Sequence, residues 1–507
     1  MVELARLNPK AVFALLLANI ALSYWAFYLD PVINNDGVLY VSIANLILEG
    51  DWQNAFKFYN WPFYPALIAA LSSVLFIEAE LAAYLLNAIL IILLTFGFTS
   101  VVGELSGYQR NIMLIALVVV VLFPSITKYR AYMIRDFGYL ACYLWSLYFL
   151  LRFCREHKRS HLIGWILLAL ASCLFRFEGI AFLLVAPYFL VLFIGQDLQH
   201  RRKILVALAT LLLGSSLAAL SWYIHSKYAT SIEVAEMAGL KIGSLTDLFY
   251  HNLSQRYGKD IMSLQGVFAV VVGNIGDVSY EVLRRLAVVY FVFAMIAIAI
   301  GLVLKEKLTR QIWLIYLVVN LLLLIGYSVF NSFLVSRYTM ATALTVLLLA
   351  PFTIHHLLVN WHTAGIVKKT ITALSFLILI LVSIEGLDVR TNKLHQKEAG
   401  EWISENLPSD SRIYSNNRIV MYYSGTPAMT NLSDRYSNLR YNELLRSDRL
   451  ERYDYIALDV NNDSRLENDF RTTLWFEFGS PVAIITGRDD NNVYIHGTKM
   501  CPASTTF

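Results

Sequence analysis

Charged residues and cysteines are scarce in this chain of 507 residues. Asp, Glu, Lys and Arg together make up 15% of the sequence, hydrophobic residues make up 57%, and the mean hydropathy is +0.56. Soluble globular domains carry about 25% charged residues, so the composition excludes a soluble protein and predicts a polytopic membrane protein. The four cysteines do not indicate a disulfide framework, because Cys142 and Cys173 fall inside apolar segments.

Familiar cofactor motifs are also missing. The sequence has no Walker loop and no GxGxxG segment that would couple it to a nucleotide. Its ten histidines do not indicate a zinc site made only of protein ligands. A net charge of +4 gives no reason to expect nucleic acid as a partner.

Apolar segments of roughly 20 residues can each cross a bilayer as a helix. About eleven such segments predict an all-α polytopic membrane domain. They centre on residues 11–29, 81–102, 111–126, 136–152, 162–177, 179–195, 203–224, 285–304, 311–330, 338–358 and 369–388. Arg6 and Lys10 precede the first segment and no small-residue cleavage site follows it, so we expect a retained span. Residues 62–77 are apolar but shorter, and they either span the membrane or form a juxtamembrane helix.

The positions of the basic residues indicate whether residues 62–77 span the membrane. If residues 62–77 do not cross and the N-terminus is cytoplasmic, almost every basic cluster in a short loop is cytoplasmic, as the positive-inside rule requires. These clusters are Arg110; Arg152, Arg155, Lys158 and Arg159; Arg201, Arg202 and Lys203; Lys305, Lys307 and Arg310; and Lys368 and Lys369. We therefore expect a multi-pass protein of the inner (cytoplasmic) membrane with its C-terminal part outside.

This topology divides the chain into two domains. Residues 1–388 form the transmembrane domain, with outer loops over residues 30–80 and 225–284. Residues 389–507 are polar with mixed charge, which predicts a small external (periplasmic) α/β domain. Its expected elements are a helix over residues 396–406, a buried strand over 455–460, and a hairpin of residues 482–486 and 493–496.

The first outer loop places a carboxylate beside the bilayer. Asp36 follows the first span by a few residues and precedes an apolar, helix-prone stretch. Such a carboxylate can take a proton from an attacking hydroxyl group if its surroundings tune its pKa. It can also cap the helix that follows, since Asp is a favoured N-cap residue. The residue alone leaves both roles open.

The same loop contains a run of aromatic and proline residues, Phe58-Tyr59-Asn60-Trp61-Pro62-Phe63-Tyr64-Pro65. Its simplest interpretation is an aromatic belt at the membrane interface. Tyr40, Asn60, Trp61 and Tyr64 are at the same time candidates for contact with a lipid-anchored substrate.

A second outer loop holds Lys128, Arg130, Arg135 and Asp136. Basic residues on the outer face do not follow the positive-inside rule. A phosphate or pyrophosphate bound at the level of the lipid headgroups would explain them, because Arg binds phosphate bidentately. The alternative is that Arg135 and Asp136 only anchor the chain at the headgroups. A divalent metal ion held by Asp36 and Asp136, with water and phosphate, is a further option. No other cofactor is expected.

Two more pairs lie at the outer starts of predicted spans. Arg284 and Arg285 could bind a substrate phosphate or anionic lipid, and lipid is slightly favoured. Arg337 and Tyr338 could reach the headgroup of a donor.

Arg176 and Glu178 occupy a very short outer turn between two apolar segments. A charged pair is costly there unless it is used or mutually neutralised. We expect a structural ion pair.

In combination, these pieces resemble the lipid-phosphate-sugar-dependent glycosyltransferases of the C superfamily, which include the protein mannosyltransferases and the bacterial aminoarabinose transferase of lipid A. The likeness follows nearly the whole chain in order. The matching segments are Asp36-Gly37-Val38-Leu39-Tyr40, Trp61-Pro62-Phe63-Tyr64-Pro65, Arg135-Asp136, Phe175-Arg176-Phe177-Glu178-Gly179, Ser336-Arg337-Tyr338 and Glu401-Trp402-Ile403-Ser404-Glu405-Asn406-Leu407-Pro408. The resemblance implies that Asp36 is a catalytic base.

The chain also departs from this pattern. Many relatives have Asp-Glu in the first loop, whereas this chain has Asp36-Gly37 and lacks the second carboxylate. Some relatives have Lys before the proline step, where this chain has Asn60 and Trp61. Other cations would then have to bind the phosphate of the donor, and Arg135 and Arg337 are the candidates.

The resemblance implies that the protein transfers a monosaccharide, with inversion, from a polyprenyl-phosphate donor to a hydroxyl group of a glycan, lipid or protein. The reaction would take place on the outer face of the membrane, where the protein also contacts membrane lipids. One alternative is a glycan polymerase or ligase that uses a pyrophosphate-linked donor. Another is a multi-span lipid-sugar flippase or transporter, whose charged residues should line a path at the midplane. The clearest charges of this chain cluster at one boundary instead.

Overall fold

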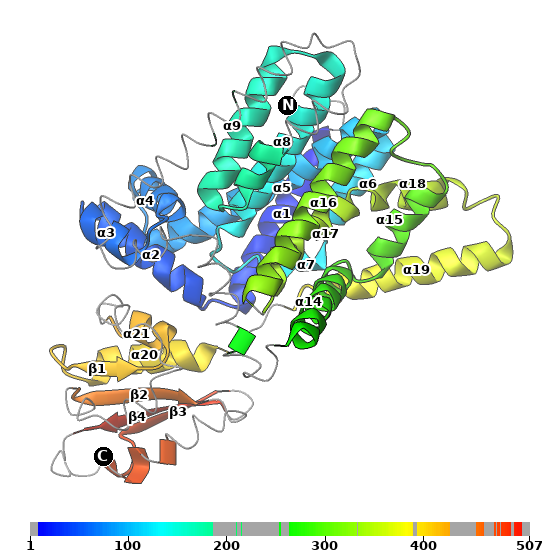
Figure 1. Ribbon diagram of the computed structural model, residues 1–507. Coiled ribbons are helices and arrows are strands. Elements are labelled where there is room, and N and C mark those ends of the chain that lie inside the picture. The colour runs from blue at the N-terminus through cyan, green and yellow to red at the C-terminus, as the bar shows by residue number, and fades with distance from the viewer. Residues whose placement is uncertain are drawn as a thin grey trace. The chain divides into compact units, whose positions relative to one another are not determined.

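The computed structural model describes residues 9–185, 263–331, 333–388, 393–425, 453–460, 478–487 and 491–498, together with positions 209, 214, 253, 254, 471, 472 and 474–476. The chain forms two compact units. One consists of Met1–Ala26, Leu85–Arg130 and Arg135–Asp388, and the other of Phe27–Tyr84, Ala131–Ile134 and Val389–Phe507. Figure 1 labels their helices and strands.

The first unit is helical. The helices that lie wholly or mainly in it are α1 (Pro9–Leu29), α5 (Ala79–Ser106), α6 (Arg110–Val121), α7 (Pro124–Thr127), α8 (Asp136–Glu156), α9 (Arg159–Phe175), α14 (Leu264–Arg285), α15 (Val289–Ala299), α16 (Lys307–Asn331), the 3-10 helix η3 (Ser336–Thr339), α17 (Met340–Leu347), α18 (Ala350–Val359) and α19 (Ile366–Glu385). Long apolar runs without internal proline account for most of them.

Six helices of the described residues are long and apolar enough to cross a membrane, namely α1, α5, α8, α14, α16 and α19. A seventh span results if η3–α17 and α18, which are bent by 42° at their junction, count as one broken helix. The predicted spans at 111–126, 162–177 and 285–304 contain the shorter helices α6, α9 and α15. Of the span at 179–195, residues 186–195 lie outside the described residues, as do nearly all of the span at 203–224 and the cluster Arg201, Arg202 and Lys203. A polytopic helical domain is therefore confirmed, but a count of eleven is not.

The sequence predicts an outer loop over residues 225–284, and the last part of this segment is helical. From Leu264 onward the chain forms α14, a helix of 22 residues. Asn274, Asp277 and Glu281 interrupt its apolar pattern, so a search for continuous hydrophobicity misses it. The rest of the predicted loop, apart from residues 253, 254 and 263, lies outside the described residues.

α8 is fixed from two sides. It runs beside α9 (Figure 1), and Gly138 permits this approach, since a Cβ there would collide with the ring of Phe175. On the other side, Tyr143 Oη lies 2.7 Å from Thr345 Oγ1 and accepts a hydrogen bond of 2.8 Å from Asn320 Nδ2. Such bonds between membrane helices contribute about 0.6–2 kcal/mol each.

The second unit contains three helices of the first loop, α2 (Asn35–Leu48), α3 (Trp52–Phe58) and α4 (Phe63–Leu75). α4 has 13 residues, which gives it a length of about 20 Å. The hydrocarbon core of a bilayer is about 30 Å thick. This length favours the arrangement in which residues 62–77 do not cross.

The C-terminal part of the second unit is a small α/β domain. Its elements are α20 (Leu394–Asn406), β1 (Ile413–Ser415), α21 (Arg418–Tyr423), β2 (Tyr455–Val460), β3 (Ala483–Thr486) and β4 (Asn492–Gly497). The strand order is β1-β2-β4-β3, with β1 parallel to β2 and the other pairs antiparallel. Ala399 and Ile403 of α20 and Val420 of α21 pack against Ala457 and Val493 of the sheet. The predicted helix, buried strand and hairpin strands are confirmed.

Gly138→Ala should destabilise the contact between α8 and α9. The added methyl group meets the ring of Phe175, and overpacking of this kind costs about 1–3 kcal/mol. We expect a lower midpoint of thermal unfolding for the purified protein in detergent. Gly276→Ala in α14 is the matched control, because its Cβ would have no neighbour within 4 Å, and it should keep or raise the midpoint. Equal midpoints for both variants would contradict the close packing.

Candidate functional site

Asp36 lies in the first turn of α2. The N-cap position belongs to Asn34, whose Oδ1 accepts a hydrogen bond of 2.8 Å from the backbone N–H of Met133. The expectation that Asp36 is itself the N-cap is therefore wrong. A carboxylate in the first turn still interacts favourably with the helix dipole, and its catalytic role stays a prediction.

Gly37 has a steric reason to be glycine. A Cβ at this position would lie 2.9 Å from Asn34 Oδ1 and from Ile33 Cγ1, and 3.0 Å from Met133 Sδ. A second carboxylate after Asp36 would therefore require the surrounding segment to move. The Asp36-Gly37 sequence fits the packing of this loop.

Two of the predicted substrate contacts are core residues. The rings of Tyr40 and Tyr64 lie edge to face, with centroids 5.1 Å apart, and Tyr40 makes a similar contact with Tyr59 at 5.7 Å. Tyr64 is only 1% exposed and Tyr40 only 6%, so these rings pack α2 against α4. Asn60 is exposed and Trp61 is half-buried, which leaves these two with surface for a ligand.

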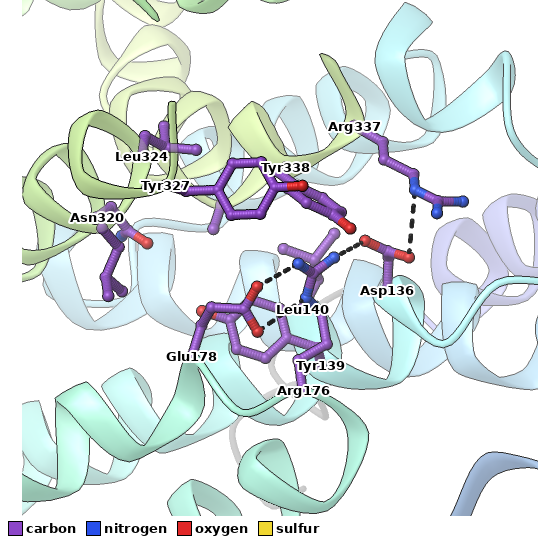
Figure 2. Close-up of a pocket in the computed structure, with 12 residues that line it drawn as sticks. Asp136, Tyr139, Leu140, Arg176, Glu178, Asn320, Leu324, Tyr327, Arg337 and Tyr338 are labelled. Carbon is purple, nitrogen blue, oxygen red and sulfur yellow. Dashed lines mark hydrogen bonds and ion pairs between the residues drawn. The ribbon is translucent and has the colours of Figure 1, made fainter. Parts of the chain in front are cut away.

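The first unit contains a cleft where the start of α8 meets the turn after α9 and the helix η3 (Figure 2). Its free space is about 490 Å³, part of it open to solvent. The lining residues are Asp136, Tyr139, Leu140, Arg176, Glu178, Asn320, Leu323, Leu324, Tyr327, Arg337, Tyr338 and Ala341. Charged and aromatic side chains thus share one apolar-walled cleft.

Arg176 is the buried centre of this cleft. Its guanidinium forms ion pairs with Asp136 and Glu178 (Figure 2), and its Cζ lies 4.0 Å from the ring centroid of Tyr338. The side chains of Arg176 and Asp136 are each 6% exposed. Burial by itself raises the pKa of the Glu178 carboxyl, but the charge and hydrogen bonds of Arg176 outweigh burial and hold this pKa below its ordinary value. Glu178 is therefore ionised at neutral pH.

Arg337 is the more accessible cation of the cleft. Its Nε lies 4.0 Å from Asp136 Oδ2, and its side chain is 22% exposed. The neighbouring Tyr338 packs edge to face against Tyr327, with ring centroids 5.0 Å apart. Arg337 is thus held less tightly than Arg176 and lies nearer to solvent.

Arg135 is the N-cap residue of α8 and does not line the cleft. Its charge nevertheless acts on Glu178. The charged groups of the cleft and its border are thus the guanidinium groups of Arg176, Arg337 and Arg135 and the carboxylates of Asp136 and Glu178. The surplus of one positive charge suits a phosphate, because guanidinium binds phosphate oxygens bidentately.

The other predicted arginine pair has different surroundings. Arg284 forms an exposed salt bridge of 2.8 Å with a glutamate one turn earlier in α14. Arg285 is buried and donates hydrogen bonds to Tyr129 Oη at 2.9 Å and to Ser336 Oγ. Neither arginine lines the cleft. Arg285 instead supports η3, the element that carries Arg337.

Asp136 does not fit a metal ion. Its Oδ1 pairs with Arg176 and its Oδ2 faces Arg337, so a metal cation would meet two guanidinium groups of like charge. Within the described ranges, no three side chains of His, Cys, Asp or Glu are grouped to hold a metal ion. The hypothesis of a metal ion shared by Asp36 and Asp136 is unsupported at Asp136.

From the sequence, Arg176 and Glu178 were expected to form only a structural ion pair. In the structure they are also candidate site residues. The ion pair is confirmed, and in addition it lines the same cleft as Asp136 and Arg337. A signal was present in the sequence, because charged residues in a very short turn between apolar segments often mark functional sites. Tyr139, Asn320 and Tyr327 gave no comparable signal, since single polar residues are common in apolar helices.

Comparison with known proteins establishes the fold. Neither a family model nor a curated protein sequence matches this chain. Among solved structures, the crystal structure of ArnT from Cupriavidus metallidurans bound to undecaprenyl phosphate matches over 98% of this chain and 100% of its own, with a TM-score of 0.55 and 12% sequence identity. The apo state of the same protein matches over 97% and 99%, with a TM-score of 0.48 and 13% identity. The chain therefore has an ArnT-like polytopic fold, and together with the apolar helices this supports an integral membrane protein.

Asp136→Ala should strongly destabilise the first unit. It removes one of the two carboxylates that pair with the buried Arg176, and breaking a buried pair costs about 3–5 kcal/mol. Glu178→Gln is the comparison, because this side chain is 34% exposed and the amide oxygen can still accept a hydrogen bond. We expect a larger fall in the thermal unfolding midpoint for Asp136→Ala. A wild-type midpoint for both variants would refute the described role of these pairs.

Proposed function

We propose that this chain is a membrane glycosyltransferase that moves a monosaccharide from a polyprenyl-phosphate donor to an acceptor hydroxyl group on the outer face of the membrane. The observation that carries the proposal is the likeness in fold, over nearly the whole chain, to ArnT bound to undecaprenyl phosphate. The arginine cleft of the first unit supplies the chemistry that such a donor needs. The acceptor is a glycan, lipid or protein.

Arg337 is the cation that we assign to the donor phosphate. Arg176 is committed to two carboxylates, whereas Arg337 is more exposed and farther from Asp136. The ion pairs of Arg176 fix Asp136, and Asp136 in turn faces Arg337. Tyr327 and Tyr338 line the same cleft as Arg337 and provide aromatic surface beside the proposed phosphate site. Positive charge at the phosphate would stabilise it as the leaving group.

Asp36 is the general base of the proposed reaction. The acceptor hydroxyl gives its proton to the carboxylate of Asp36 and attacks the anomeric carbon in line. The bond from that carbon to the phosphate oxygen of the lipid breaks, and the configuration inverts. Asp36 is the acidic residue in the first turn of α2, where a carboxylate interacts favourably with the N-terminal end of the helix dipole.

The ends of the helices support the proposed orientation. The start of α8, the turn after α9 and the C-terminal half of α16 line the cleft, and the basic clusters at residues 152–159 and 305–310 lie at the other ends of these helices. By the positive-inside rule those clusters are cytoplasmic, which makes the cleft external. We assign the domain after residue 389 to the same external side.

A transporter is less well supported. The charged pairs of the described helices lie near helix ends, as Asp136 with Arg176 and Glu104 with Arg155 illustrate. A transport path would require charged groups near the midplane. The middle of α8 instead carries the neutral contact of Tyr143 with Thr345.

The reaction can be tested with radiolabelled monosaccharides on undecaprenyl phosphate, supplied to sealed vesicles of known orientation. We expect label to leave the lipid only where the external face is accessible. Asp36→Asn should slow this transfer by about 10²–10⁴-fold, since it removes the proton acceptor with little change in shape. Transfer by the variant within a few-fold of wild type would refute the role of Asp36. Use of pyrophosphate-linked donors alone would refute the donor class.

Recognition of the phosphate can be tested with conservative variants. Arg337→Lys keeps the charge but loses the planar fork. The loss of one charge-assisted hydrogen bond should weaken use of the donor by roughly tenfold or more in kcat/KM. Arg310→Lys is the matched control, because this arginine is exposed at the opposite end of α16. If Arg135→Lys impairs transfer and Arg337→Lys does not, Arg135 rather than Arg337 binds the donor phosphate.

A further inference from the structure

The first unit contains a second, larger pocket, which lies at the other end of α8 from the arginine cleft. Its free space is about 1090 Å³, part of it open to solvent, against about 490 Å³ in the cleft. Arg155 near the end of α8 lines this pocket, whereas Asp136 at the start of the same helix lines the cleft. The helical rise between these two residues is about 28 Å, close to the hydrocarbon thickness of a bilayer, about 30 Å. In a bilayer crossed by α8, the pocket therefore lies at the level of the lipid headgroups on the side opposite to the cleft.

The wall of this pocket combines charged and apolar surface. Arg155 and Lys305 are its cations, and His355 and His356 of α18 add two imidazole rings. α6 runs beside α18 in this part of the unit (Figure 1). The apolar part of the wall includes Leu105, Ile112, Val303 and Phe352. Such a wall matches a ligand that is anionic at one end and apolar at the other.

Arg155 is held by a buried carboxylate and has one edge that a ligand can use. Its Nη1 donates hydrogen bonds to Glu104, of 2.7 Å to Oε1 and 2.8 Å to the backbone oxygen. The Glu104 side chain is only 4% exposed. The other edge of the guanidinium, formed by Nε and Nη2, shares a single oxygen of Glu306 at 3.3 and 3.2 Å. Charge-assisted bonds of this kind are normally about 2.7–2.9 Å long, so a phosphate with two oxygens would satisfy this edge better.

Glu306 is a replaceable partner at that edge. Its side chain is 49% exposed, and exposed ion pairs contribute little to stability. Its Oε2 also accepts a hydrogen bond of 2.8 Å from Thr309 Oγ1. The preceding Lys305 is exposed and has no ion-pair partner among the described residues. The loop that carries both residues is anchored by the buried side chains of Val303 and Leu304.

We propose that this pocket binds the phosphate group of an anionic phospholipid. The Nε–Nη2 edge of Arg155 and the ammonium of Lys305 hold the phosphate, and the apolar wall contacts the rest of the lipid. Glu306 pairs with Arg155 until the phosphate displaces it. Basic pockets between membrane helices on the cytoplasmic side bind anionic headgroups, and we assign this end of the helices to that side. The inference does not rest on the proposed transfer reaction, because the donor site lies in the cleft at the other end of α8.

Lipid binding can be measured on the full-length protein in a neutral detergent, by native mass spectrometry with added dioleoylphosphatidylglycerol. Dioleoylphosphatidylcholine has the same acyl chains but no net charge, and it should bind more weakly. Lys305→Gln should weaken binding of the phosphatidylglycerol by about fivefold, the effect expected of one lysine beside an anionic lipid. Glu306→Gln should strengthen it, because this variant removes the competing charge from the edge of Arg155.

Lys307→Gln is the matched control. It changes the net charge equally, but Lys307 is an exposed residue that does not line the pocket, so binding should weaken much less. Equal weakening by Lys305→Gln and Lys307→Gln, or equal binding of the two lipids, would overturn the inference. Displacement of the phosphatidylglycerol by an equal concentration of inorganic phosphate would assign the pocket to a soluble phosphate compound and overturn the lipid as ligand. Arg337→Lys should leave the Lys305-dependent binding unchanged, which separates this site from the proposed donor site.

Discussion

The ion pairs of Arg176 are the interaction on which the first unit depends. A buried guanidinium is costly unless its charge is paired or its N–H groups are hydrogen-bonded, and Asp136 and Glu178 pair with Arg176 from the start of α8 and from the turn after α9. The pairs hold these two elements together at the mouth of the cleft. They also set the position of Asp136, which faces Arg337. A single buried charge therefore determines both the packing of the helix ends and the electrostatics of the candidate site.

Much of the helical architecture follows from hydrophobicity alone. Runs such as residues 81–102 and 311–330 are long, apolar and free of proline, so α5 and α16 could be predicted directly. α14 could not, because its polar residues interrupt the pattern. The C-terminal strands β2, β3 and β4 were predictable from their apolar runs and turn residues, whereas the three-residue β1 was not predicted.

The candidate site was harder to predict than the fold. Arg337 and the cluster that contains Asp136 stood out because outer cations break the positive-inside pattern and need a reason. The meeting of Asp136 with Arg176 and Arg337 depends on contacts between residues 40 or more positions apart, which no local pattern encodes.

The central claim is that the arginine cleft receives the phosphate of a polyprenyl-phosphate donor. The most direct measurement is a cryo-electron microscopy structure of the full chain with undecaprenyl phosphate. The account predicts a phosphate oxygen within about 2.7–3.2 Å of the Arg337 guanidinium, with Arg176 still paired to Asp136. A phosphate bound elsewhere, with no contact to this cleft, would contradict it.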